Sequence, residues 1–407
     1  MKKSEMITVK QDHPEKIKCG GIYDIIVIGG GFAGVAAAVA AARMKQNVML
    51  IDKRVMLGGL GTAGMISHYL ALCDGFGRKI IRGLSEELMH AVIRYGYDTL
   101  SDEWRSGPEF VENPSKRYDT WFSIPEGAAA LEELMISENV TILYDALLSD
   151  VIMSGATCEY VITEEKGGKT AYKAQVFIDA SGDAVLFGKC GANTVSGESL
   201  VSYGAHHMDT TLCSNALESG NIKDALEFRW YGDFPVPGRV RRFPTMKVED
   251  STEETEFIIK GRSVYLESIK EKGKQNSRCT VLWPSMMMAR KVRRIEGEYT
   301  LMPEDKDRHV EDSIGCISDW RNPGPVYEIP FRALYTGSLH NVLACGRCIS
   351  SDGDAWEVTR VIPPAALTGQ AAGTAATMIC KEGKDICSLD VGALQEKLSK
   401  DKVLIHF

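Results

Sequence analysis

Residues 23–34 read Tyr-Asp-Ile-Ile-Val-Ile-Gly-Gly-Gly-Phe-Ala-Gly, and this stretch decides the predicted fold. Its apolar run, Asp24–Ile28, is typical of a strand buried on both faces of a parallel sheet. The run ends in three glycines at the spacing G-x-G-x-x-G, and the Ala- and Val-rich segment Val35–Met44 then predicts a helix packed on the sheet. In such a unit the glycines permit a tight turn, close approach to a pyrophosphate, and close contact of helix and strand.

A carboxylate follows at the position that this unit requires. The next predicted strand, Asn47–Ile51, ends in Asp52, and a carboxylate there accepts hydrogen bonds from an adenosine ribose. The N-terminus of the preceding helix offers unpaired N–H groups and a positive dipole end to phosphates. A glycine-rich turn in an ordinary α/β unit is the less favoured interpretation. We therefore predict that the chain binds a dinucleotide.

Composition excludes several classes of protein. The 407 residues suffice for two domains, and a net charge of −8 with a pI near 5.6 disfavours a nucleic acid partner. Met1–Gly21 lacks the apolar core of a secretory signal, and no run approaches the ~20 apolar residues that cross a membrane. The eleven cysteines are scattered through a long chain. We expect a cytoplasmic protein in the reduced state, without a membrane partner; the sequence gives no prediction of its oligomeric state.

A second glycine-rich stretch makes a family resemblance specific. Leu57–Gly64 reads Leu-Gly-Gly-Leu-Gly-Thr-Ala-Gly and leaves backbone N–H groups free to face a flat or anionic ligand. Together with the first stretch it resembles the FAD-dependent oxidoreductases of the glutathione-reductase-like superfamily, in particular the bacterial group related to fumarate reductase and heterodisulfide reductase flavin subunits. The resemblance implies noncovalently bound FAD. Relatives more often carry Glu at the ribose position, where this chain has the shorter Asp52.

Three later stretches extend the resemblance to most of the chain: Val176–Asp183, Asn341–Cys348 and Arg360–Ala376. Many members of the superfamily have Asp where this chain has Arg347, so the resemblance suggests a cation near the pyrophosphate or flavin. The last stretch predicts a helix whose N-terminus faces the flavin pyrimidine. The resemblance implies cofactor contacts by Gly29, Gly31, Phe32, Ala33, Gly34, Asp52, Lys53, Gly59, Thr62, Gly64, Met65, Ala146, Leu147, Gly182, Gly346, Arg347, Arg360, Gly369, Gln370 and Ala371.

The predicted fold class is α/β, with a Rossmann-like FAD-binding domain of the glutathione-reductase type. This domain is discontinuous and comprises residues 20–195 and 336–407, with a helical insertion at 67–122. Residues 196–335 lack the glycine-rich α/β rhythm and are predicted to form a mainly β (α+β) substrate domain.

Three histidines are candidate catalytic residues. His68 follows the second glycine stretch, and the resemblance puts this region near the flavin ring, although a locally hydrogen-bonded histidine explains it as well. His206 and His207 lie on the predicted strand Glu198–Asp209. Because adjacent strand residues face opposite sides, at most one of this pair can point into a flavin pocket. No nearby ligand completes a metal site with the pair, so no metal is predicted.

Arg293 is a further catalytic candidate. It lies in an arginine-rich stretch that resembles a family motif before a strand near the active cleft. Ion pairing with Glu296 or Asp305 would explain the arginines equally well. The pair Cys345 and Cys348 has the spacing of a redox motif, but its apolar strand favours a structural role.

The expected reaction is hydride transfer between a small organic substrate and the flavin N5, with an external electron donor or acceptor. The chain has one dinucleotide fingerprint and no cysteines at iron–sulfur spacing, so electrons must enter or leave through a substrate or carrier. Two alternatives stay open: a fumarate-reductase-like reduction of an activated double bond, and a flavin electron-transfer subunit without its own substrate. The acidic pI disfavours a flavin-dependent RNA-modifying protein.

Overall fold

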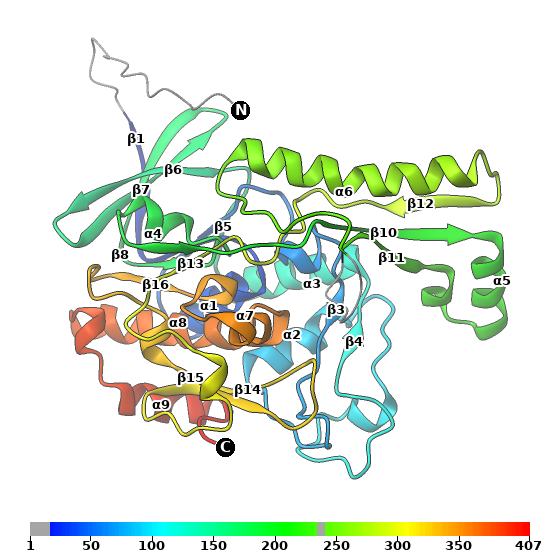
Figure 1. The fold of residues 1–407 in the computed structure, drawn as a ribbon. Coiled ribbons are helices and arrows are strands. Elements are labelled where there is room, and N and C mark those ends of the chain that lie inside the picture. The colour runs from blue at the N-terminus through cyan, green and yellow to red at the C-terminus, as the bar shows by residue number, and fades with distance from the viewer. Residues whose placement is uncertain (1–16, 234–240) are drawn as a thin grey trace.

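The structure, a computed structural model, describes residues 17–233 and 241–407 (Figure 1). The sequence prediction about a secretory signal in Met1–Gly21 falls mostly on residues outside these ranges. Within the described ranges, none of the helices has the length and apolar character needed to span a membrane.

A seven-stranded sheet forms the centre of the molecule. Its order is β5-β2-β1-β8-β7-β6, and β16 also pairs with β8. The pairs of β1 with β2 and β8, of β2 with β5, and of β8 with β16 are parallel, whereas β6, β7 and β8 form an antiparallel meander. The strands are β1 (Lys18–Ile28), β2 (Val48–Ile51), β5 (Thr141–Leu143), β6 (Leu147–Ser154), β7 (Thr157–Glu165), β8 (Gly168–Asp179) and β16 (Val342–Ala344).

Both faces of the parallel part are buried, as the apolar run Asp24–Ile28 predicts. Alternate residues of β1 enter different cores: Ile25 and Val27 join one, and Ile26 and Ile28 join the other. The first core is covered by helices α1 (Phe32–Arg43), α2 (Leu84–Val92), α3 (Ile124–Ser137), α8 (Ile362–Glu382) and α9 (Val391–Lys400). The second core holds the meander and α4 (Val185–Lys189). The predicted α/β, Rossmann-like fold class is confirmed.

Helices α1 and α8 pack unusually closely because two glycines remove side chains from their interface. A Cβ atom on Gly369 would lie 2.1 Å from the carbonyl oxygen of Ala33, and one on Gly373 would lie 2.1 Å from that of Ala37. Real Cβ atoms do not approach carbonyl oxygens this closely, so only glycine fits at either position. The Ala-rich α1 therefore supports α8 along its length and fixes both helix N-termini relative to the sheet.

The sequence predicts a helical insertion at residues 67–122, and this prediction is wrong for most of the segment. Its helices are α2 and the single turn Asp102–Trp104, and the short pair β3 (His68–Tyr69) and β4 (Thr120–Trp121) joins its two ends. Gly83, with φ of +68°, stands directly before α2, and glycines and prolines interrupt the flanking segments. Tertiary packing holds the rest of the insertion in place. The ring centroids of Trp104 and Tyr118, for example, stack 4.6 Å apart within the first core.

A separate three-stranded sheet lies beside the main one. Strand β10 (Ser202–Asp209) is central and pairs antiparallel with β11 (Glu227–Gly232) and β12 (Arg278–Leu282). Helix α6 (Ser251–Lys272) runs alongside these strands in Figure 1, and α5 (Thr210–Ser219) follows β10. Two small cores, which include Val201 and Tyr203, belong to this unit. The sequence predicts a mainly β (α+β) region here, but the described part of this unit has more helix than strand: α5 and α6 have 10 and 22 residues, whereas β10, β11 and β12 have 8, 6 and 5.

The end of this region lies earlier than the predicted boundary at residue 335. Strands β14 (Ser313–Ser318) and β15 (Val326–Pro330) contribute Ile314, Ile317 and Ile329 to the same core as α1 and α8. The last residue of the separate small cores is Val292, and β13 (Arg293–Ile295) then pairs with β9 (Thr194–Ser196). The predicted boundary is wrong because it rests on where the glycine-rich α/β motifs stop. β14 and β15 form an antiparallel hairpin, which needs no such motif.

Replacing Gly373 by Ala should destabilise the fold, because the new methyl group collides with the Ala37 carbonyl and pushes α8 from α1. We expect the free energy of unfolding to fall by roughly 1–3 kcal/mol in urea or guanidinium titrations. Gly167→Ala is the matched control, since a Cβ there meets nothing within 4 Å. Equal stability of the two variants would show that the helices are not held at this distance.

Candidate functional site

Four separate stretches of the chain converge on one groove at the N-terminus of α1, which we call the dinucleotide groove. The glycine turn after β1, the loop after β2, the loop after β8 and the segment from β16 into α8 all line it. Half of the predicted cofactor contacts lie on this groove: Gly29, Gly31, Phe32, Ala33, Asp52, Gly59, Gly182, Gly346, Arg347 and Arg360. The sequence motifs therefore meet in space although more than 300 residues separate them.

The glycine turn leaves the N-terminus of α1 open. Its N-cap residue is Gly31, and a Cβ there would meet nothing within 4 Å. The first turn of α1 holds no acidic side chain and its N-cap receives no side-chain hydrogen bond from the described residues. Gly29 has φ of +110°, and a Cβ on Gly34 would lie 1.8 Å from the Gly29 carbonyl oxygen. Open space in front of free N–H groups and a positive dipole end fits the pyrophosphate of a dinucleotide.

Asp52 ties the end of β2 to this turn. Its Oδ2 accepts a hydrogen bond from the Gly30 N–H at 2.5 Å, and its Oδ1 accepts one from the Arg54 N–H at 2.7 Å. The side chain is 4% exposed at the groove wall. A carboxylate has about four lone-pair sites, so these two bonds leave Asp52 able to accept from ribose hydroxyls as well. The acceptor oxygens of Asp52 and the N–H donors at the start of α1 together fit an adenosine dinucleotide.

The second glycine loop contributes only Gly59 of the predicted contacts to the groove. The Thr62 hydroxyl donates to the Leu57 carbonyl at 2.5 Å, and a Cβ on Gly64 would lie 2.7 Å from the Leu60 oxygen. These residues therefore hold the loop in shape rather than line the groove, and Gly34 does the same for the first turn. Lys53 is exposed, Ala146 is buried beside Asp52, and Leu147 is 51% exposed; the adenine contact stays a prediction.

Arg347 is held by protein groups that the sequence did not reveal. Its Nε donates to the Gly182 carbonyl at 2.7 Å, its Nη1 to the Ala289 carbonyl at 3.1 Å, and its Nη2 pairs with Asp183 at 2.6 Å. The guanidinium thus fixes the loop after β8 against the strand end at Gly346. Asp183 lies 164 residues before Arg347, and no local signal predicts this pair.

Arg360 is also paired within the chain. Its Nε donates to Glu357 at 2.8 Å, and Lys291 pairs with the same carboxylate at 2.9 Å. Burial raises the pKa of Glu357, but the charges of Arg360 and Lys291 outweigh it and lower this pKa to about 2. The carboxylate is therefore ionised at neutral pH. The three-residue spacing of Glu357 and Arg360 on a helix is the signal that could have predicted their pairing.

Gly369, Gln370 and Ala371 do not reach the groove. The part of α8 that lines it is Ile362 and Ala365, and Gly369 lies seven residues beyond the helix start, about 10 Å along the axis. The Gln370 Oε1 accepts a hydrogen bond from the Leu84 N–H at 2.8 Å instead. The prediction placed these contacts too far along the helix, because the sequence does not show which turn of α8 faces the groove.

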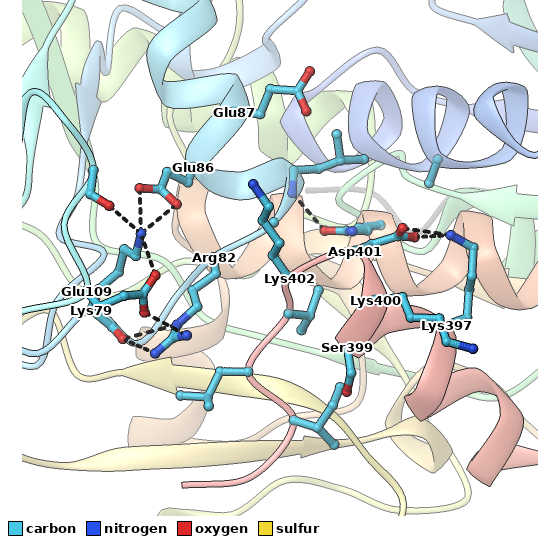
Figure 2. A pocket seen from close by; sticks show the side chains of 18 of the residues that line it. Lys79, Arg82, Glu86, Glu87, Glu109, Lys397, Ser399, Lys400, Asp401 and Lys402 are labelled. Atoms are coloured by element: carbon cyan, nitrogen blue, oxygen red, sulfur yellow. Dashed lines mark hydrogen bonds and ion pairs between the residues drawn. The ribbon is translucent and has the colours of Figure 1, made fainter.

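Gln370 lines a cavity of about 1250 Å³, larger than the dinucleotide groove, which lies by the C-terminal end of α1. Figure 2 shows its charged walls, where Lys79 lies between Glu86 and Glu109 and Lys397 pairs with Asp401. Size alone would select this cavity. The glycine motifs surround the other end of α1, so we place the functional site in the dinucleotide groove.

His68 lies beyond the second glycine loop, on β3. Its ring stacks on Trp121 with centroids 4.6 Å apart and planes 7° apart, and its Nε2 lies 3.7 Å from a carboxylate oxygen of Asp119. The side chain is 27% exposed. His68 thus has a fixed ring plane, a carboxylate neighbour and access to solvent.

His206 and His207 lie on opposite faces of β10. The His206 Nε2 lies 3.4 Å from the carbonyl oxygen of Met65, the residue that ends the second glycine loop. Because a carbonyl only accepts, we assign the ring proton to Nε2. The Nδ1 atom is buried and has no hydrogen-bond partner within residues 17–233 and 241–407. Burial lowers the pKa of His206 to about 4, so the ring is neutral at pH 7.

His207 faces α6 and lies away from the groove. The Tyr231 hydroxyl is 2.7 Å from its Nε2, and the Thr280 hydroxyl is 3.2 Å from its Nδ1. Burial, followed by the charges of Arg278 and Arg229, lowers the pKa of His207 to about 4. Both ring nitrogens have partners, which is the arrangement of a structural histidine.

The remaining candidates serve the scaffold. Arg293 donates from Nε to the Asp183 carbonyl at 2.8 Å, so it supports the loop after β8 and does not line the groove. Neither Glu296 nor Asp305 is its partner at that nitrogen. Cys345 and Cys348 are fully buried, and burial raises the pKa of both thiols, which opposes thiolate formation.

Replacing Asp52 by Ala should weaken FAD binding roughly tenfold or more, because a hydrogen bond to a charged group contributes about 1.5–3 kcal/mol. The affinity is measured by titrating the apoprotein with FAD and following flavin fluorescence. Asp24→Ala is the control: Asp24 also accepts a backbone N–H between β1 and β2, but at the opposite end of these strands. Unchanged affinity in the Asp52 variant would remove this residue from the site.

The buried His206 should make the fold sensitive to acid. Its pKa is about 4 in the folded chain and about 6.5 when unfolded, so the unfolded chain binds more protons between these values and stability falls as the pH falls. Between pH 7 and 4.5, wild type should lose about 2 kcal/mol more unfolding free energy than His206→Gln. The exposed His340→Gln is the control. Parallel pH profiles of wild type and His206→Gln would contradict the buried, neutral state.

Comparisons with known proteins agree with the geometry. A family model described as FAD dependent oxidoreductase matches residues 24–253 and 243–398. Nicotine dehydrogenase of Pseudomonas putida is 30% identical over 95 residues, which are 23% of this chain and 19% of that protein. A tRNA uridine 5-carboxymethylaminomethyl modification enzyme of Borrelia garinii is 25% identical over 215 residues, 49% of this chain and 31% of that protein. The chain thus matches less than a third of either relative's length.

Solved structures show the same fold. The p-nitrophenol 4-monooxygenase of Pseudomonas putida superposes with a TM-score of 0.52 at 11% identity, covering 92% of this chain and 83% of that one. Such low identity supports the fold and not a reaction. The family match covers most of the chain and includes every stretch that lines the dinucleotide groove. This chain belongs to the family of FAD-dependent oxidoreductases.

Proposed function

We propose that the chain catalyses hydride transfer between a small organic substrate and the N5 atom of noncovalently bound FAD. An external electron donor or acceptor completes the cycle. The observation that carries the proposal is the buried, unpartnered Nδ1 atom of His206, whose other ring nitrogen, Nε2, contacts the Met65 carbonyl just after the second glycine loop. An unsatisfied buried acceptor costs about 1–3 kcal/mol, and a ligand that donates to it removes that cost.

Phe228, whose ring contacts His206, also lines a candidate substrate cavity. The rings of His206 and Phe228 are 4.9 Å apart, and Phe228 also lies 5.8 Å from Trp121. Phe228, Trp121 and Trp230 line a cavity of about 900 Å³, whose other walls carry polar side chains such as Asn215 and Glu227. Five apolar or aromatic and six polar or charged residues line it, so it combines rings that can stack on a substrate with groups that can orient one. This cavity favours an enzyme over an electron-transfer subunit without its own substrate.

The histidines have different parts in the proposed reaction. When bound, FAD supplies the two-electron acceptor or donor for the hydride. The neutral His206 accepts a hydrogen bond at Nδ1 from a substrate hydroxyl or amine; its pKa of about 4 makes it a positioning group rather than a base at neutral pH.

His68 is the proposed acid or base. Its Nε2 lies 3.7 Å from a carboxylate oxygen of Asp119, which can orient the ring. Its ring stacks on Trp121, which lines the cavity, and its 27% exposure gives a route for the proton to solvent.

The direct test is anaerobic reduction of the holoprotein by candidate substrates. Small hydroxy compounds, sugars and amines are mixed with the protein under nitrogen while the flavin absorption is recorded. We expect at least one of these classes to bleach the flavin, and NAD(P)H alone to leave it oxidised. Reduction by dithionite or a partner protein, but by no small substrate, would favour the electron-transfer alternative.

Once a substrate is found, His68→Gln and His206→Gln should affect different kinetic quantities. His68→Gln should lower the rate of flavin reduction about 100-fold and remove an ionisation from its pH profile. His206→Gln should raise the substrate Kd about tenfold and leave the shape of the pH profile unchanged. Stopped-flow reduction measures both. His207→Gln, on the opposite face of β10, is the control, and an effect of His207→Gln as large as that of His206→Gln would contradict this assignment.

A further inference from the structure

Three potential metal ligands from distant parts of the chain meet on the surface beside β15. They are His309, Glu328 and His406, and their ligand atoms all lie within 4.8 Å of one another. The Glu328 Oε2 is 2.9 Å from Nδ1 of His406 and 3.6 Å from Nδ1 of His309. The two imidazole rings are 4.5 Å apart. None of the three residues lines the dinucleotide groove.

The carboxylate at the centre of this cluster is held rigidly. Glu328 is buried on β15, its Oε2 accepts the Val310 N–H at 2.8 Å, and its Oε1 accepts the Phe407 N–H at 3.1 Å. These contacts with backbone N–H groups leave a lone pair of Oε2 directed at the histidines. Backbone hydrogen bonds to a ligating carboxylate are the usual outer shell of a metal site.

The segment that carries His406 is also anchored. The Cys316 N–H donates to the Leu404 carbonyl at 2.8 Å, and the Ser313 hydroxyl donates to the Ile405 carbonyl at 2.6 Å. The side chain of Ile405 is buried against β14. His309 and His406 themselves are 65% and 39% exposed, so their rings can adjust by tenths of an ångström without disturbing the core.

Hydrogen bonding explains only part of this arrangement. Nδ1 of His406 is within hydrogen-bond distance of Oε2 of Glu328. Nδ1 of His309 is the ring nitrogen of that residue nearest to the same oxygen, but at 3.6 Å it is too far for a hydrogen bond. A cation between the three atoms instead satisfies all of them.

We propose that Nδ1 of His309, Nδ1 of His406 and Oε2 of Glu328 bind one divalent transition metal ion, with Zn²⁺ the favoured ion. Two imidazoles and one carboxylate form a donor set typical of Zn²⁺ at bond lengths of about 2.0–2.2 Å. Such bonds at tetrahedral angles place ligand atoms roughly 3.2–3.6 Å apart. The two contacts to Oε2 lie close to this range. Water completes the coordination on the exposed side.

The ion would act on stability rather than on the flavin chemistry. It joins the chain segment around His406 to β15 and to the loop that carries His309, and these two lie 78 and 97 positions earlier in the chain. No metal was predicted from the sequence, because these ligands are 19 and 78 positions apart, outside the spacing of any short metal motif.

The test uses the full-length holoprotein after treatment with a chelator. Zn²⁺ is titrated by calorimetry, and Co²⁺ is titrated by absorption of its ligand-field bands. We expect one equivalent of metal per chain, a rise in the thermal unfolding midpoint with Zn²⁺, and histidine-type cobalt bands. His309→Ala and His406→Ala should each weaken Zn²⁺ binding at least tenfold and abolish the rise in midpoint.

His340→Ala, an exposed histidine elsewhere, is the control and should bind Zn²⁺ as wild type does. Because His309 is mostly exposed, its variant is expected to fold, which circular dichroism checks. Zn²⁺ held by exposed cysteines would persist unchanged in both cluster variants, and this result would overturn the proposal. Absence of stoichiometric binding to wild type would overturn it as well, and would leave the histidines as hydrogen-bonding partners of Glu328.

Discussion

The hydrogen bond from the Gly30 N–H to Asp52 is the contact on which the site depends. It joins the turn after β1 to the end of β2, so the open N-terminus of α1 and the Asp52 carboxylate are held in a fixed relative position. This geometry needs glycine at the turn, because side chains at Gly29 or Gly34 would collide with backbone atoms. It also needs α1 held in place, which the glycine contacts of α8 provide. The geometry of the cofactor site therefore depends on positions where only glycine fits against neighbouring backbone atoms.

Local patterns predicted this part of the molecule well. Each step of the dinucleotide unit is short, and the spacing of the glycines and Asp52 follows directly from the geometry of one βαβ unit. The same reasoning placed Gln370 wrongly relative to the groove, because a small-residue helix does not reveal from its sequence which turn faces a ligand. The groove-lining part of α8 is its first turn.

Contacts between residues far apart in the chain could not be predicted from the sequence. Arg347 meets Asp183 across 164 positions, and His206 meets Met65 across 141. Alternation along a strand limited the histidine pair to one inward ring, but only the packing of α6 against the His207 face shows which ring that is. Domain boundaries failed for a related reason: β14 and β15 lack a motif, and their place in the main core follows from packing alone.

The central claim is that FAD lies in the dinucleotide groove with its ribose at Asp52, and a crystal structure of the FAD-loaded protein tests it most directly. The account predicts density for the pyrophosphate before the N-terminus of α1 and a ribose hydroxyl within hydrogen-bond distance of Asp52. Density for FAD in the 1250 Å³ cavity at the other end of α1 would contradict it.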